Sequence, residues 1–154
     1  MNGAHVNEFL TFNLADQIFG VSVLQVNDVL GPQRITRMPL APPSISGVMN
    51  LRGRIVTAVD VRRCLGQKVR DDSAESMSVV VDVNGELFSL IIDSVRDVLS
   101  ISHDQLESVP ATLDPAWQSV ASSIYKLQDK LVVILDVDQL LQMTKTNTVT
   151  QGEA

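Results

Sequence analysis

Apolar and polar residues alternate along several short stretches of the chain, a pattern typical of β-strands with one buried face. The first such stretch covers 10–14, and after a short polar turn a second covers 18–23. Together they predict an antiparallel hairpin. A second hairpin is predicted for 79–92, because Asn84 and Gly85 at its centre both tolerate the positive φ angles of a two-residue turn.

Two further pairs of strands are predicted later in each half of the chain. One joins 45–50 to 54–59, and the other joins 120–125 to 130–135. Gly53 lies in the first of these turns and adopts positive φ without a steric penalty. About five short strands in each half, with turns every 8 to 12 residues, favour a small β-barrel over an open sheet.

Aspartates mark the starts of two predicted short helices. Asp60 and Asp136 each follow a strand, so that the carboxylate can accept a hydrogen bond from an unpaired backbone N–H of the first helical turn. Residues 66–76 are polar and charged and form the predicted linker between the two halves. The last residues, 144–154, carry almost no apolar side chains, and we expect a disordered tail.

The chain contains an internal repeat. At an offset of 69 residues, the apolar positions of 12–30 coincide with those of 81–99 without a gap, and at an offset of 76 residues 54–65 coincides with 130–141. The sequence therefore predicts an all-β fold of two tandem five-stranded SH3-like barrels with short helices. The expected division of this single domain of 1–154 gives 9–66, with 135–143, to the first barrel, and 77–134 to the second.

Composition limits the classes of function. The 154 residues are 45% hydrophobic, enough for a folded core, and no apolar run approaches the ~20 residues of a membrane-spanning helix. The N-terminus lacks a signal-peptide pattern and the lone cysteine, Cys64, suits a reducing compartment, so the cytoplasm is expected. Cys64 itself is interpreted as a small apolar core residue.

The net charge of −6 argues against a nucleic-acid binder, which needs a dense positive surface. This charge is distributed unevenly, with +4 up to Arg70 and −10 from Asp71 onward. Either the two halves face different partners, or both charges only keep the surface soluble.

The sequence contains no recognisable catalytic or metal-binding motif. The two histidines, His5 and His103, lie in the N-terminal segment and in a predicted connecting loop, and no phosphate-binding glycine motif is present. The carboxylate pair Asp71 and Asp72 falls in the predicted linker. We therefore expect a non-enzymatic protein with no catalytic residue, cofactor or metal.

Positions that differ between the two copies are candidates for function. Arg52 lies at a hairpin tip, where the second copy has Gln128. A guanidinium group at such a tip can bind carboxylates or backbone carbonyls of a partner. The alternative is that Arg52 forms an internal ion pair that braces its own loop.

The segment 45–62, ISGVMNLRGRIVTAVDVR, resembles the signature of the CheW family of bacterial chemotaxis coupling proteins, and the resemblance extends over nearly the whole folded chain. It implies two SH3-like barrels and a cytoplasmic adaptor, bound to membrane-anchored receptor arrays without entering the membrane and monomeric when free. The implied partners are the cytoplasmic tip of methyl-accepting chemotaxis receptors and the regulatory domain of the histidine kinase CheA. The implied receptor-binding residues are Val26, Asp28, Asn50 and Arg52, and the implied kinase-binding residues are Gly47, Val48 and Leu51.

Some alternatives remain open beside this resemblance. Val26 and Asp28 recur in the second copy, which favours a structural role for them, and Gly47 fits either a close backbone approach or a strand bulge. The chain departs from the family at Ser122 and Ser123, where glycine is frequent. Two other functions fit the same fold: an adaptor of a non-motility chemosensory pathway, and a small ligand-binding barrel, although only 4% of residues are aromatic and could stack on bases.

Overall fold

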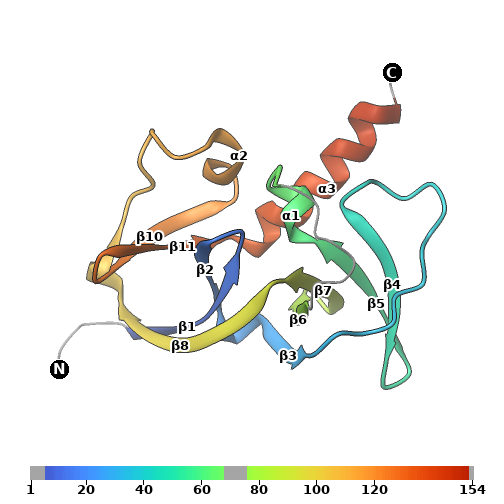
Figure 1. Cartoon of the computed structure of the whole chain (residues 1–154), viewed down its shortest axis with the longest axis horizontal. Helices are drawn as coiled ribbons and strands as arrows, with labels where there is room; N and C mark the ends of the chain where they lie inside the picture. The colour runs from blue at the N-terminus through green and yellow to red at the C-terminus, as the bar shows by residue number, and fades with distance from the viewer. Residues whose placement is uncertain (1–5, 68–75, 153–154) are drawn as a thin grey trace.

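Two β-sheets form the body of the protein (Figure 1). The computed structural model describes residues 6–67 and 76–152. Its strands are β1 (Val6–Leu14), β2 (Gln17–Ser22), β3 (Val26–Leu30), β4 (Ile45–Leu51), β5 (Arg54–Asp60), β6 (Met77–Val83), β7 (Glu86–Ile92), β8 (Ser94–Ser102), β9 (Leu106–Glu107), β10 (Ala121–Leu127) and β11 (Lys130–Leu135). The helices are the short η1 (Val23–Gln25), α1 (Val61–Cys64), η2 (His103–Gln105) and α2 (Pro115–Gln118), and the longer α3 (Val137–Gly152).

The two sheets do not correspond to the two halves of the chain. The six-stranded sheet has the order β8-β1-β2-β11-β10-β9, and the five-stranded sheet has the order β3-β6-β7-β5-β4. The mostly-β fold with two sheets and short helices is confirmed. The expected division into 9–66 and 77–134 is wrong, because the first hairpin pairs with strands of the second copy and the second hairpin with strands of the first.

The strand registers show that this exchange follows the internal repeat. Thr57 lies opposite Phe88 between β5 and β7, while Val133 lies opposite Phe19 between β11 and β2. The second pair is the first one shifted by the offsets of 76 and 69 residues. Each copy of the repeat thus gives its hairpin to one sheet and its later strands to the other, and the two copies are intertwined.

Three apolar clusters hold this arrangement together. The largest lies between the two sheets and includes Phe12, Phe19, Val81, Leu90 and Leu140. A second cluster is confined to the six-stranded sheet: Phe9, Ile18, Ile101, Val132 and Ile134. A third is confined to the five-stranded sheet: Met49, Val56, Val80 and Leu87. Each sheet therefore has its own small core, and complete burial of side chains such as Phe12 contributes about 1.5–3 kcal/mol each.

The predicted turns and caps are largely confirmed. Asn84 and Gly85 have φ angles of 55° and 86°. The carboxylate of Asp60 accepts a hydrogen bond from the N–H of Arg62 at 3.1 Å, and that of Asp136 accepts one from Gln139 at 3.2 Å. Both aspartates therefore cap helices as expected.

The tail differs from the expectation of disorder, because α3 continues to Gly152. Its first turns pack Leu140 and Leu141 into the central core, and once a helix is nucleated each further residue adds a hydrogen bond at little cost. Of the predicted linker 66–76, positions 68–75 lie outside the described residues, as do His5, Asp71 and Asp72. Across the described ranges, no helix has both the length and the apolarity that crossing a membrane requires.

Candidate partner-binding surfaces

Asp28 and Arg52, two of the predicted receptor-binding residues, form an ion pair on the surface. The Nη2 atom of Arg52 lies 2.6 Å from Oδ2 of Asp28. The Arg52 side chain is 71% exposed, whereas that of Asp28 is 23% exposed. The hydrogen bond from Arg52, followed by one from the N–H of Val29 at 2.8 Å, lowers the pKa of the Asp28 carboxyl.

This ion pair connects the two edges of the five-stranded sheet. Asp28 lies on β3 and Arg52 lies in the turn between β4 and β5, and β3 and β4 are the outermost strands of the sheet. A contact between opposite edges requires the sheet to curve, as expected for a barrel-like fold. Both interpretations of Arg52 are thus compatible with its position: it braces the sheet internally and remains accessible to a partner.

The β4–β5 turn holds Arg52 in a defined backbone conformation. Arg52 and Gly53 have φ angles of 52° and 85°. The side-chain oxygen of Asn50 accepts a hydrogen bond from the N–H of Gly53 at 3.0 Å. Asn50 therefore stabilises the turn that carries the arginine.

Val26 lies near this group but faces elsewhere. The register of β3 against β6 shifts between Val26 and Asp28, so the two side chains do not follow the usual alternation. Val26 packs against the central core, whereas Leu30 packs against the core of the five-stranded sheet. The structure thus joins Asp28, Asn50 and Arg52 in one site, with Val26 at its inner border.

Gly47 is buried, and its neighbour in space belongs to the same chain. A Cβ atom at this position would lie 2.1 Å from the carbonyl oxygen of Thr36, a distance that real side chains do not reach. Gly47 also has a φ angle of 149°, and the β4 register shifts between Ile45 and Gly47. Both structural explanations of this glycine therefore hold: a backbone approaches closely, and the strand has a bulge.

The other predicted kinase-binding residues are also engaged internally. The backbone of Val48 exchanges two hydrogen bonds with Thr36, of 2.8 and 2.9 Å, and these cover part of the open edge of β4. Leu51 packs against the core of the five-stranded sheet. The surface at this edge is consequently formed by the preceding segment, 31–44, together with the strand.

The equivalent place in the six-stranded sheet lacks the ion pair. The repeat places Gln128 where the first copy has Arg52, and Gln128 carries no charge to bind Asp97. Lys126 instead lies 3.8 Å from Glu107 on the neighbouring strand β9. At the departure from the family pattern, Ser122 donates a hydrogen bond to the carbonyl of Ile134 at 3.3 Å. The two copies therefore present different surfaces on the same framework.

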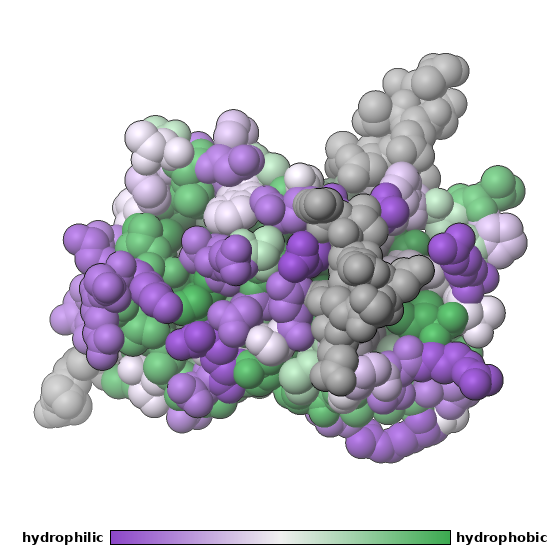
Figure 2. All heavy atoms as spheres, viewed as in Figure 1, coloured by the Kyte–Doolittle hydropathy of each residue, from purple (hydrophilic) through white to green (hydrophobic). Residues whose placement is uncertain are grey.

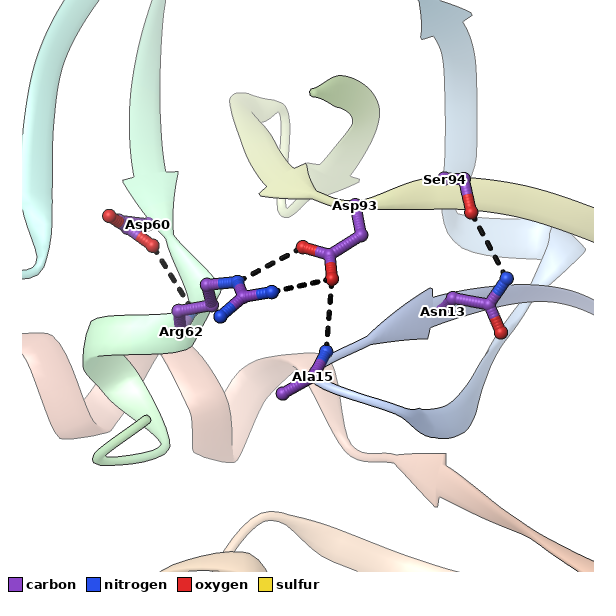
Figure 3. A network of polar contacts seen from close by, with 6 residues as sticks. All are labelled: Asn13, Ala15, Asp60, Arg62, Asp93 and Ser94. Atoms are coloured by element: carbon purple, nitrogen blue, oxygen red, sulfur yellow. Dashed lines mark hydrogen bonds and ion pairs between the residues drawn. The ribbon is translucent and has the colours of Figure 1, made fainter. Parts of the chain in front are cut away.

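Sequence reasoning missed a polar network where α1, the β1–β2 turn and the β7–β8 junction meet (Figure 3). Arg62 donates from Nε and Nη2 to the two carboxylate oxygens of Asp93, at 3.0 and 2.7 Å. The N–H of Ala15 donates to the same carboxylate at 3.0 Å, and Asn13 donates to Ser94 at 3.0 Å. The bond to Asp93, opposed by desolvation, raises the pKa of Arg62. No local motif announces the network, because its partners are 31 to 81 residues apart.

A pocket of about 610 Å³ opens beside this network, lined by Asn13, Asp16, Gln17, Ile18, Asp93, Ser94, Arg96, Lys130 and Leu131. Its lining carries charges of both signs. In the described ranges, no group of three or more His, Cys, Asp or Glu side chains could hold a metal ion.

Comparison with known proteins identifies the family. The model of the CheW-like domain matches residues 8–145, which is most of the chain. The chain belongs to the CheW family. The match includes both copies of the repeat, and the ion pair, the β4–β5 turn and the polar network all lie within it.

Relatives of this CheW-like chain agree with the assignment. The chemotaxis protein CheW of Rhizobium meliloti is 27% identical over 133 residues, with 86% of each chain covered. That of Klebsiella aerogenes is 28% identical over 134 residues, covering 87% of this chain and 81% of the relative. The crystal structure of the scaffolding protein TtCheW from Thermoanaerobacter tengcongensis has a TM-score of 0.77 and 29% identity, covering 86% of this chain and 90% of that one. The CheW-like fold is thus shared along nearly the full length.

Proposed function

We propose that the chain is a non-enzymatic adaptor that couples methyl-accepting chemotaxis receptors to a CheA-type histidine kinase. It works in the cytoplasm at membrane-anchored receptor arrays, is a monomer when free, and binds the cytoplasmic tip of the receptors and the regulatory domain of the kinase. It uses no cofactor. The names of its relatives, chemotaxis protein and scaffolding protein, support this role.

The receptor site in this proposal consists of Val26, Asp28, Asn50 and Arg52. The observation that carries it is the Asp28–Arg52 ion pair, in which an exposed guanidinium is held in place before any partner binds. Asp28 accepts from Nη2 of Arg52, so Nε and Nη1 can still donate to a partner carboxylate or carbonyl. Holding the side chain in advance reduces the entropy lost on binding.

The kinase site in this proposal lies at the β4 edge, around Gly47, Val48 and Leu51. It is separate from the receptor site, since β4 and β3 are opposite edges of the five-stranded sheet. An adaptor with two separate surfaces can hold both partners at a fixed geometry. A change in the receptor then biases the kinase through differential contacts, and many modest interfaces become strong in an array.

The decisive experiment for the receptor site is Arg52→Ala, with Gln128→Ala at the equivalent turn of the six-stranded sheet as the matched control. We expect Arg52→Ala to weaken binding of a receptor cytoplasmic fragment about tenfold or more, as for other arginine hot spots. Gln128→Ala should leave the affinity unchanged, and both variants should keep the thermal midpoint because exposed ion pairs contribute little stability. Equal receptor affinity of Arg52→Ala and the unmodified chain would contradict the site.

A further inference from the structure

The segment between β3 and β4, residues 31–44, presents large apolar side chains to solvent. Leu40 is fully exposed, with a relative accessibility of 102%, and Met38 is 47% exposed. Figure 2 shows apolar atoms projecting at the right-hand edge of the molecule, where Figure 1 places this segment. A single exposed leucine needs no explanation. The feature here is that the backbone around Leu40 and Met38 is held in place.

The segment is anchored on both sides of these residues. Before them, Thr36 exchanges two backbone hydrogen bonds with Val48. After them, the N–H of Ile45 donates to the carbonyl of Pro42 at 2.9 Å. Pro39, Pro42 and Pro43 further restrict the backbone between the anchors. A loop fixed in this way loses little conformational entropy when a partner binds.

Leu40 has a φ angle of 65°, a left-handed conformation that its Cβ atom disfavours. The fold therefore holds an apolar side chain, fully exposed, in a backbone conformation that glycine or asparagine would adopt more easily. Strain of this kind at an exposed position is typical of functional sites rather than of packing.

The charges around these apolar residues indicate the kind of partner. Arg34 and Arg37 are exposed, and neither forms an ion pair with another described residue. Arginines beside an exposed apolar contact favour a partner surface that carries carboxylates around an apolar pocket.

We propose that Met38 and Leu40 form an apolar knob that inserts into a pocket bordered by acidic residues on the kinase regulatory domain. Gly47 contributes from beneath: without a Cβ it allows Thr36 to approach β4 and so fixes the loop that carries the knob. The contact on the kinase side is thus made by the loop as well as by the strand. This inference rests on the proposed adaptor function and specifies its kinase surface.

Leu40→Gly separates binding from folding, because glycine accepts the φ angle of this position and removes the exposed side chain. The control is Leu24→Ala, which removes another exposed leucine, 90% accessible, on η1. Titration calorimetry with the purified kinase regulatory domain and, separately, with the receptor fragment measures each affinity. We expect Leu40→Gly to weaken kinase binding at least tenfold, to leave receptor binding unchanged and not to lower the thermal midpoint.

Two results would overturn the inference while leaving the adaptor function standing. One is kinase affinity unchanged by Leu40→Gly in a chain that binds the kinase; the other is a loss of receptor binding instead. Failure of the unmodified chain to bind the kinase would overturn the adaptor function and the knob together. As an independent arm, the double variant Arg34→Glu and Arg37→Glu should slow association with the kinase and flatten its dependence on salt. An association rate equal to that of the unmodified chain would refute the acidic border of the pocket.

Discussion

Replacing Asp93 with alanine should destabilise the protein more than any other substitution of a charged residue discussed here. Asp93 accepts two hydrogen bonds from Arg62 on α1 and one from the N–H of Ala15 in the β1–β2 turn. The arginine and the aspartate are only 19% and 22% exposed. Removing the carboxylate therefore leaves a largely buried guanidinium and a backbone N–H without their acceptor.

The size of the effect follows from this geometry. Breaking a fully buried ion pair costs about 3–5 kcal/mol, and partial solvent access reduces this figure. A net loss of about 3 kcal/mol in the free energy of unfolding is expected, including the unpaired N–H. For a domain of this size, that corresponds to a drop of about 6–12 °C in the thermal midpoint.

Urea denaturation followed by circular dichroism measures this loss directly. The matched control is Asp97→Ala on β8, because Asp97 is exposed and only its backbone takes part in the described hydrogen bonds. A surface substitution of this kind should stay within about 0.5 kcal/mol. A double-mutant cycle with Arg62→Gln isolates the pair. If Asp93→Ala and Asp97→Ala cost the same, the network does not brace the structure and this reasoning fails.

Three further predictions follow from individual contacts. Gly47→Ala should cost about 2–4 kcal/mol through backbone strain and lost hydrogen bonds, whereas Gly31→Ala, with open space around it, should cost little; equal urea midpoints would refute this. Arg52→Gln should raise the pKa of Asp28 toward its ordinary value, as measured by NMR, and no shift would mean that the ion pair does not form in solution. Because the folded-state pKa of Asp28 is lowered, the pair is complete above the ordinary carboxyl pKa and is lost as the pH falls through the lowered value. Burial raises the pKa of the Cys64 thiol to about 12, so a thiol reagent at pH 8 should react only after unfolding, and rapid reaction of the folded protein would contradict its burial.

The hairpins and helix caps could be predicted from the sequence because they depend on neighbouring residues. Alternation, Asn84-Gly85 and the two capping aspartates act over a few positions, and the structure has all of them. The pairing of the hairpins with the other strands could not be predicted in the same way. The repeat shows that the two copies share a pattern, and an exchange of hairpins satisfies that pattern as well as separate barrels do.

The candidate site was only partly predictable for a similar reason. The sequence offered two roles for Arg52, and the structure combines an internal ion pair with an exposed side chain. It offered two explanations for Gly47, and the structure has both. What the sequence could not indicate is that the backbone approaching Gly47 belongs to Thr36 of the same chain. The bond between Arg62 and Asp93 joins residues from different elements and has no local signature.

The central claim is that this chain joins a receptor and a kinase in one assembly. Sedimentation of the purified chain with a CheA-type kinase and with a receptor cytoplasmic fragment, separately and together, tests it most directly. The account predicts binding to each partner alone, and larger assemblies with altered kinase autophosphorylation when all three are present. Binding to neither partner would contradict it, leaving a CheW-like fold with a different task.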